Sequence, residues 1–243
     1  MITRKIIHLM AVAALVLHAA PSQAETQAEI QRALANPIAD LASLPFQLNY
    51  DQNIGASERG SRWTLNVQPV IPFEIGEWNL ISRSIVPLVR QNDVSGTSIQ
   101  TGVGDIVQSF FLSPATLGPG GLVWGVGPVF LLPTATDDAL GADTWGAGLT
   151  GIVLKQAGPW TYGFLANHLW DFSGPADINA TFAQPFLSYG FSNGWTGTLQ
   201  SEATYDWNTD SASVPVALIA QTLNVIPVSY TQLTLPTKRE GRD

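Results

Sequence analysis

The chain of 243 residues contains no cysteine, so it can form no disulfide and offers no thiolate for catalysis or metal binding. Charged residues are scarce, at 12% of the chain against about 25% in typical globular domains. Long apolar runs are also missing. No stretch after residue 24 reaches the roughly 18 consecutive apolar residues of a transmembrane helix, which argues against a helical membrane protein.

The first 24 residues have the organisation of a secretory signal peptide. Arg4 and Lys5 precede an apolar stretch over residues 6–20, and the small residues Ser22 and Ala24 provide a cleavage site. We therefore predict a cleavable signal peptide over residues 1–24. An N-terminal membrane anchor is the alternative, but the apolar stretch is shorter than the roughly 20 residues that span a bilayer.

Removal of the signal peptide makes the chain more acidic and almost free of histidine. Nine basic residues then face nineteen acidic ones, a net charge of −10, which disfavours nucleic acid as a partner. Of the three histidines only His168 remains. An exported, apolar chain without a spanning helix belongs to one of two classes: a secreted soluble β protein or an outer-membrane β-barrel.

The hydrophobic period changes from helical to strand-like near residue 45. Residues 25–44 predict a short N-terminal helical segment, interrupted at Pro37, that either plugs the interior or stays in the periplasm. The clearest strand is "WTGTLQSEATYDW", residues 195–207, in which polar even positions alternate with mostly apolar odd ones. Its ten steps from Trp195 to Tyr205 cover roughly 33 Å of strand, or roughly 25 Å of height when tilted, the apolar band of an outer-membrane barrel.

Nine further strands are expected along residues 45–226, which gives about ten in all. Several of them alternate poorly, and "LVWGVGPVFLLP" is apolar on both faces, so its orientation cannot be read from the sequence. The predicted strand ranges are 46–50, 63–71, 78–90, 105–112, 122–133, 147–156, 160–171, 181–191, 195–207 and 213–225.

Short and long connections alternate along these strands. The long ones are "GASERG", "QNDVSGTSIQTGVG", "TATDDALGADTWG", "DFSGPADINA" and "NTDSA", and tight Gly-containing turns or "SPATLGPGG" lie between them. Transmembrane barrels have short periplasmic turns and longer outer loops. The alternation favours an all-β, antiparallel, up-and-down transmembrane β-barrel over a soluble sandwich.

Tryptophans follow three of the short turns. Trp78, Trp160 and Trp195 are expected to form an aromatic girdle at the membrane interface, with Tyr205 and Trp207 at the opposite edge. The alternative is that each ring packs on a hairpin end in a soluble fold.

Several segments, including "ANPIADLASLPFQLNYDQNIG", "GLVWGVGPVFLLPTATDD" and "GAGLTGIVLKQAGPWTYGFLANHLW", resemble a family of bacterial outer-membrane barrel proteins. Its members are called transporters or phenol-degradation (MetA-pathway) proteins, and some carry the misnomer neuromedin U. The resemblance covers roughly residues 35–225. It implies a barrel of twelve strands in the outer membrane and uptake of hydrophobic or aromatic compounds.

The end of the chain departs from that resemblance. Residues 227–243, "PVSYTQLTLPTKREGRD", are polar and charged, whereas barrels of this kind end on a strand with a terminal aromatic residue. The segment resembles a peptide read from adaptor DNA. We therefore expect a tail that is not native and a barrel, residues 45–226, that lacks about two strands.

The polar faces of the strands supply the candidate functional residues. If the apolar faces contact lipid, the opposite side chains line a lumen, and Arg62 and Glu202 could pair across it. The lumen-lining candidates are Arg62, Asn66, Gln68, Gln200, Glu202 and Asp206.

Catalytic and metal-binding patterns are weak. His168 near Asp171 is the one candidate for a lipid hydrolase or acyl transferase, but no serine partner is identified by spacing, and an interfacial histidine beside Trp170 is the simpler interpretation. The cluster Asp137, Asp138 and Asp143 matches no calcium motif. We expect no enzyme activity, no catalytic residue, no metal and no cofactor, and "TGVGD" lacks the context of a dinucleotide site.

These features together predict passive passage of small, hydrophobic or aromatic solutes through an outer-membrane barrel. Its partners would be outer-membrane lipid, lipopolysaccharide, the barrel-assembly machinery and the solute, with no nucleic acid. A lipid-modifying barrel enzyme and a structural or adhesive barrel remain the alternatives.

Overall fold

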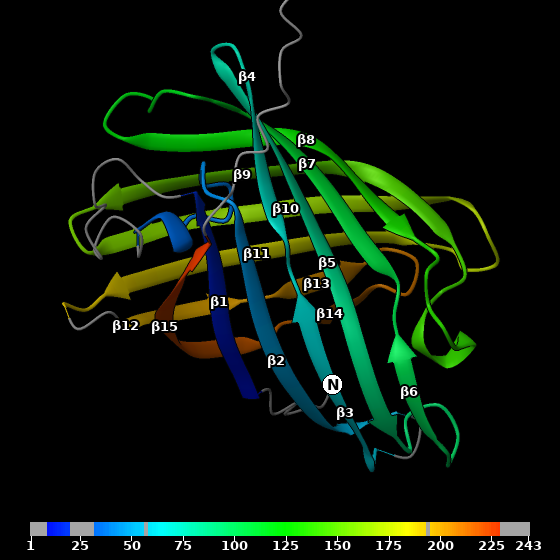
Figure 1. Ribbon diagram of the computed structural model, residues 1–243. Coiled ribbons are helices and arrows are strands. Elements are labelled where there is room, and N and C mark those ends of the chain that lie inside the picture. Colours follow the sequence, from blue (N-terminus) through cyan, green and yellow to red (C-terminus); the bar gives the residue numbers. More distant parts are fainter. Residues whose placement is uncertain (1–8, 20–31, 56–57, 193–194, 229–243) are drawn as a thin grey trace, which may run out of the picture.

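The computed structural model describes residues 9–19, 32–55, 58–192 and 195–228. They form an antiparallel up-and-down sheet with very little helix (Figure 1). The all-β, up-and-down class predicted from the alternation is thereby confirmed. No helix within these ranges is both long and apolar enough to cross a membrane.

Fifteen strands make up this sheet in the described residues, and each of the ten predicted ranges overlaps at least one of them. A single 3-10 turn, η1 (Asp138–Leu140), precedes β9, and residues 32–34 form a helical turn. The strands are β1 (Leu9–Ala19), β2 (Ser43–Ile54), β3 (Gly60–Val67), β4 (Val70–Ile75), β5 (Trp78–Asn92), β6 (Ile99–Val103), β7 (Ile106–Pro114), β8 (Leu122–Leu132), β9 (Trp145–Ala157), β10 (Trp160–Ser173), β11 (Asn179–Gly190), β12 (Trp195–Ser201), β13 (Ala203–Asp206), β14 (Ser211–Ser213) and β15 (Val216–Val228).

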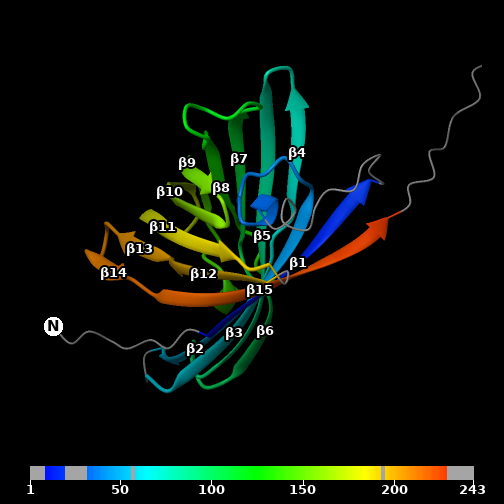
Figure 2. The same ribbon diagram turned by 90° about the vertical axis from the view of Figure 1, so that its left-hand side faces the viewer.

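Neighbouring strands follow one another in space almost in chain order. The path runs β10-β9-β8-β7-β5-β3-β2-β1-β15-β12-β11, and β10 also pairs with β11. All pairs in the described part of the chain are antiparallel except β1 with β15, which lie side by side in parallel (Figure 2). β1 falls within the predicted signal peptide, whose residues 1–8 and 20–24 are outside the described ranges, as is 229–243 of the predicted tail.

The strand that pairs with β5 is interrupted at a proline. β3 and β4 both pair with β5 and are separated only by Gln68 and Pro69. Proline has no N–H for the ladder, so the break falls there. The backbone N–H of Gln68 instead donates to Pro45 O at 2.9 Å, which keeps the two pieces against β2.

Two predicted loops were too long. Residues 91–104 were expected to be loop, yet β5 continues to Asn92 and β6 pairs with it over Ile99–Val103, leaving residues 93–98 as the connection. Likewise β14 occupies residues expected as "NTDSA". In both cases a polar or glycine-containing segment forms a strand because a neighbouring strand supplies its hydrogen bonds. This is a tertiary effect, which cannot be predicted from local composition.

The connections divide the sheet into two ends. The short-turn end holds the connections 76–77, 115–121 and 158–159 and residues 191–192, and the long-loop end holds residues 55 and 58–59 and the connections 93–98, 133–144, 174–178 and 207–210. Residues 32–42 lie at the short-turn end, where the carbonyl of Arg32 accepts a hydrogen bond from Gln156 Nε2 at 2.7 Å. The helical turn at 32–34, in blue, is beside the ends of β9 and β10 (Figure 1).

The inside of the curved sheet contains one apolar cluster. Ile38 from the N-terminal segment is 3% exposed and packs among side chains from six strands. The cluster also resolves the orientation of β8, since Gly125 is in close contact with Ile38 and Val129 is fully buried, whereas Val126 is exposed. The cluster consists of Ile38, Val70, Ile81, Phe111, Ile152, Leu154, Leu165 and Phe186.

Candidate functional site in the sheet interior

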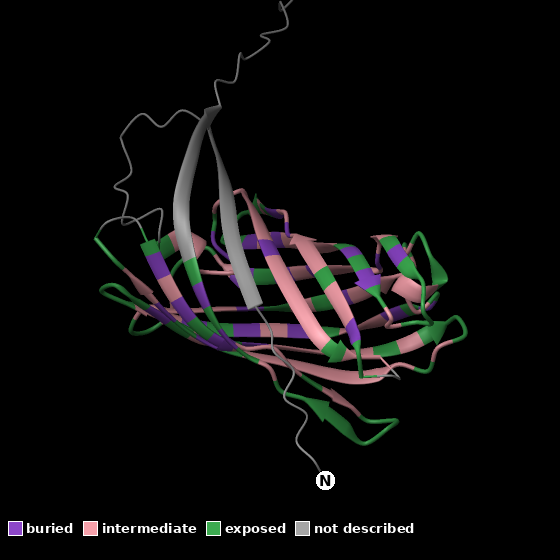
Figure 3. Ribbon diagram, turned by 90° about the horizontal axis from the view of Figure 1, so that it is seen from below, coloured by how far each residue is buried: buried purple, intermediate pink, exposed green. Residues whose placement is uncertain are grey.

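The two faces of the sheet have the opposite of the usual polarity. In β12 the outward Leu199 is 50% exposed, whereas the adjacent Gln200 is 8% exposed. Burial changes in this way from residue to residue in β12 and in parts of β7 and β9 (Figure 3). Among the described residues, fourteen polar side chains are buried against thirteen apolar ones, and twenty-six large apolar side chains are exposed. Soluble domains rarely leave so large an apolar surface open.

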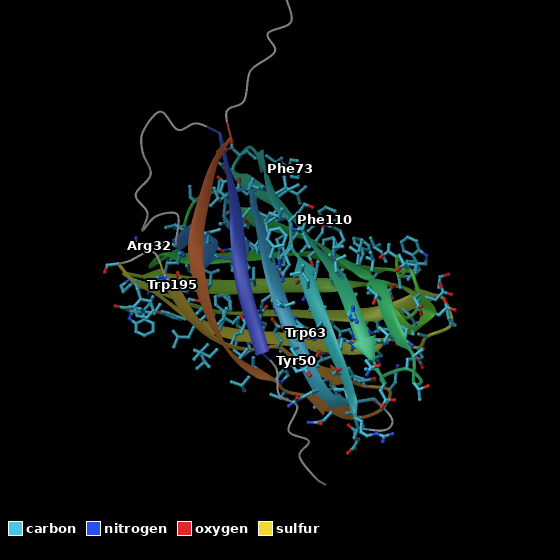
Figure 4. All side chains as sticks on the ribbon, turned by 60° about the horizontal axis from the view of Figure 1, so that its bottom comes forward. Arg32, Tyr50, Trp63, Phe73, Phe110 and Trp195 are labelled. Atoms are coloured by element: carbon cyan, nitrogen blue, oxygen red, sulfur yellow. The ribbon has the colours of Figure 1, made fainter. Side chains whose placement is uncertain are left out.

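Aromatic side chains stand on the outer surface at both ends. Trp78, Trp160 and Trp195, the three girdle candidates, are exposed and each begins a strand directly after a short connection. Tyr205 is half-buried against the exposed Trp207, with ring centroids 4.7 Å apart. Figure 4 marks Trp195 near the short-turn end and the Tyr50–Trp63 pair farther along the sheet.

The long-loop end has further exposed aromatics that the sequence had not singled out as a girdle. Trp63, Trp145 and Phe172 are exposed near this end, and the Trp145 and Phe172 ring centroids lie 6.4 Å apart. Their signal in the sequence was an aromatic residue beside a long loop, which is weaker than an aromatic residue after a tight turn.

A chain of hydrogen bonds crosses the middle of the interior. Arg83 Nη2 donates to Gln68 Oε1 at 2.8 Å, and Gln68 Nε2 donates to Gln47 Oε1 at 3.0 Å. Gln47 Nε2 in turn donates to Glu202 Oε1 at 3.2 Å, joining β2 to the link between β12 and β13. Gln200 and Gln184 extend the chain, at 2.7 Å from Gln200 Nε2 to Glu202 and 3.1 Å from Gln184 Nε2 to Gln200.

An interior cavity of about 330 Å³ borders this hydrogen-bonded chain. One side of it is polar and includes the predicted candidates Asn66, Gln68 and Glu202 together with Arg83. Apolar side chains line the cavity as well, namely Ile85, Val107, Leu165, Leu169 and Phe182, with Asn167 between the two leucines on β10.

The predicted pair of Arg62 and Glu202 has other partners in the structure. Arg62 Nε donates to Gln91 Oε1 at 2.9 Å near the long-loop end. Glu202 accepts from Gln47 and Gln200 near the middle of the interior, in the cavity that Arg83 also lines. Arg62 and Glu202 lie at different heights along their strands, which their opposite charges alone could not predict.

The connection 133–144 folds against the interior at the long-loop end. Gln91, which is 1% exposed, donates through Nε2 to the carbonyl of Ala139 at 3.1 Å and to Gln100 Oε1 at 3.2 Å. A second cavity of about 410 Å³ lies here, lined by Arg62, Gln91, Asp105 and residues 139–141 of the connection. Passage along the interior would have to pass this connection.

Asp105 fixes that connection in place. Its Oδ1 accepts from the backbone N–H groups of Thr134 and Ala135, each at 3.1 Å, and its Oδ2 accepts from Ala142 at 2.6 Å. A Cβ on Gly141 would lie 2.6 Å from Asp105 Oδ1, so only glycine allows this approach. Sequence reasoning missed Asp105, because its partners are about thirty residues away and are backbone groups.

Asp206, a lumen-lining candidate, holds a tight turn. Its Oδ1 accepts from the backbone N–H of Thr209 at 3.1 Å and of Asn208 at 2.9 Å. These hydrogen bonds lower the pKa of the Asp206 carboxyl below its ordinary value, because they stabilise the ionised form. The residue lies beyond Tyr205, outside the apolar band predicted for residues 195–205.

The hydrolase candidate His168 has no triad-like geometry. Its Nδ1 lies 2.7 Å from Thr181 Oγ1, and its ring centroid lies 4.1 Å from that of Trp170. Asp171 Oδ1 accepts from the backbone N–H of Ile178 at 2.8 Å. In the connection 133–144, Asp137 likewise accepts a hydrogen bond from a nearby backbone group, the N–H of Ala139. The described residues contain no cluster of three potential metal ligands.

Comparison of the chain with protein-family models, with curated proteins and with solved structures finds no match.

Proposed function

We propose that the protein is an outer-membrane β-barrel that lets small solutes pass passively along its interior. The observation that carries the proposal is the inverted polarity of the sheet. Apolar side chains such as Leu199 and Val153 cover the outside, while glutamines, serines and threonines face the inside. Lipid tails would contact the apolar outside, and water or polar solutes would contact the polar inside.

The pairing pattern supports closure of the sheet. Following the neighbours from β10 along the path to β11 leads back to β10, a ring of eleven strands. One of them, β1, belongs to the predicted signal peptide; without it β2 and β15 run in opposite directions and can pair directly, which closes a ring of ten. A closed ring leaves no unpaired edge, which a bilayer requires of a spanning sheet. Exposed aromatic side chains at both ends agree with two membrane interfaces.

The same proposal includes export through the cleavable signal peptide and residence in the outer membrane, with lipid, lipopolysaccharide and the barrel-assembly machinery as partners. Solutes would move by diffusion along an interior that presents hydrogen-bonding groups and apolar side chains. Gating would fall to the connection 133–144 at one end and to residues 32–42 at the other.

Two measurements in sequence test the proposal. The first is gel mobility of the membrane-extracted protein before and after boiling, where a closed barrel gives two different mobilities. The second is swelling of liposomes that contain the protein, in an isotonic solution of a small uncharged sugar, compared with protein-free liposomes. Unchanged mobility would contradict the barrel, and swelling no faster than in protein-free liposomes would contradict passage.

A further inference from the structure

Arg83 has an unusual position in the interior. It lies on β5, lines the cavity of about 330 Å³ and donates one hydrogen bond, from Nη2 to Gln68 Oε1. Among the residues that the structure describes, Gln68 is the one hydrogen-bond partner of the guanidinium. A guanidinium carries five N–H donors, so most of those of Arg83 are left for something else in the cavity.

Apolar side chains also line this cavity. They are Leu165 and Leu169 on β10, Phe182 on β11, Ile85 on β5 and Val107 on β7, while Asn167 and Gln184 on β10 and β11 add two amides. Leu165 is almost fully buried. A molecule in the cavity would therefore meet both hydrogen-bonding groups and hydrocarbon.

We infer that this cavity is a binding site for small amphipathic carboxylates, with the carboxylate on Arg83 and the hydrocarbon part against Leu165, Leu169 and Phe182. The inference deepens the proposed function and rests on it, because a solute must be able to enter the interior. It makes Arg83 the residue that determines which solutes are retained.

The chemistry of the polar side favours an anion. The planar guanidinium presents paired N–H donors that match the two oxygens of a carboxylate. Glu202, the acid in the same cavity, accepts from the side-chain amides of Gln47 and Gln200 and also interacts electrostatically with Arg83, so a ligand carboxylate would share the guanidinium with it. Gln184 adds an amide group to the cavity wall. A cavity of this volume lies at the lower end of the range for small-ligand pockets, which limits the ligand to a few carbon atoms beyond the carboxylate.

The test compares three ligands that share one tail and differ in head group: pentanoate, pentan-1-ol and pentylamine. Binding of each to the full chain in lipid nanodiscs is measured by calorimetry, with protein-free nanodiscs of the same lipid as the blank. We expect pentanoate to bind at least about tenfold more tightly than pentan-1-ol, and pentylamine to bind most weakly. Equal binding of pentanoate and pentan-1-ol, or preference for pentylamine, would overturn the inference.

Variants assign the preference to one side chain. Arg83→Gln should remove the advantage of pentanoate, and Arg83→Lys should keep part of it, because the charge remains without the paired donors. Arg90→Gln is the matched control, since Arg90 is exposed on the same strand and its loss changes the net charge equally. If Arg90→Gln loses the preference for pentanoate to the same extent, the preference is a general effect of net charge and the proposed site is contradicted. If Arg83→Gln does not show the gel mobility of the folded protein, the lysine variant and the three ligands on the unaltered chain decide.

The outcomes also separate this inference from the proposed function. Binding needs only entry to the interior, whereas liposome swelling needs passage through it. Arg83-dependent binding without faster swelling would keep the site and remove the passive transport. Faster swelling without any preference for pentanoate would keep transport and remove the site.

Discussion

The two ends of the interior are closed by different physical means. At the short-turn end, Ile38 is surrounded by apolar side chains, and this contact is almost entirely one of packing. At the long-loop end, the connection 133–144 is held by Asp105 and Gln91 through hydrogen bonds to its backbone. Packing is insensitive to salt and pH, while hydrogen bonds to a carboxylate can exchange with water. The long-loop end is therefore the one expected to open more readily.

The largest loss of stability should come from a substitution in the apolar cluster that surrounds Ile38. Phe111 on β7 is fully buried, so Phe111→Ala removes a large ring and leaves a cavity. The free energy of unfolding should fall by about 3–5 kcal/mol, measured by urea denaturation in micelles. Leu112→Ala, the next residue and exposed on the outside, should cost less because no closed cavity forms. Equal losses in the two variants would contradict the assigned inner and outer faces.

The contact of residues 32–42 with the interior can be broken separately. Ile38→Ala should weaken it by about 2–5 kcal/mol. Hydrogen exchange is the measurement, because the amides of Ile38 and Ala39 are hydrogen-bonded within this segment, to Asn36 Oδ1 and Asn36 O. Their exchange should accelerate by roughly 30-fold or more, since about 1.4 kcal/mol corresponds to tenfold. Leu117→Ala, an exposed leucine at the same end, is the control and should leave both amides unchanged.

The long-loop end should respond more weakly to loss of its main anchor. Asp105→Ala removes three hydrogen bonds to the connection 133–144, and we expect a local loss of about 1.5–3 kcal/mol, because water can replace the carboxylate. Amide exchange at Thr134, Ala135 and Ala142 reports it. Asp138→Ala changes the net charge equally on the same connection and should leave these amides protected. If both variants behave alike, the anchor is not Asp105.

The smallest effect concerns the turn at residues 206–209. The pKa of Asp206 is lowered in the folded state, so its carboxylate stabilises the turn at pH values above the ordinary aspartate pKa of about 3.9. This contribution is lost as the pH falls below that value and passes through the lowered pKa. Exchange of the Thr209 amide, corrected for intrinsic rates, should show the loss, and Asp206→Ala should abolish its pH dependence. A pH dependence retained in the variant would show that another group is responsible.

The sequence predicted the strands where two signals coincide. In residues 195–207 strict alternation follows an Asn-Gly turn, and both β12 and β13 lie there. β8 was found as a strand but not oriented, because both of its faces are apolar and only contact with Ile38 and Phe111 distinguishes them.

The candidate site was harder to predict than the strands. Asn66, Gln68 and Glu202 were expected to face inward from alternation alone, and all three line the central cavity. Arg83 was not singled out, since it lies in "LISRSIVP", where its neighbours are two serines and polar residues do not alternate with apolar ones. Asp105 was missed because its role depends on backbone groups that approach only after the sheet has curved. Alternation along the sequence predicts a strand and its two faces, whereas contacts between residues far apart in the sequence produce no such pattern.

The position of β1 has a consequence for how the sheet is sealed. Leu15 pairs with Leu44 on β2 on one side and with Asn224 on β15 on the other, antiparallel to the first strand and parallel to the second. β2 and β15 therefore run in opposite directions. If export removes residues 1–24, these two strands can pair directly, and the ring passes from eleven members to ten without a parallel seam. Leu44→Cys with Asn224→Cys, in a chain that has no cysteine of its own, should then form a disulfide in the exported protein, and failure to do so would contradict direct pairing of β2 with β15. The seam of the mature sheet would thus join the first and the last strands of the exported chain.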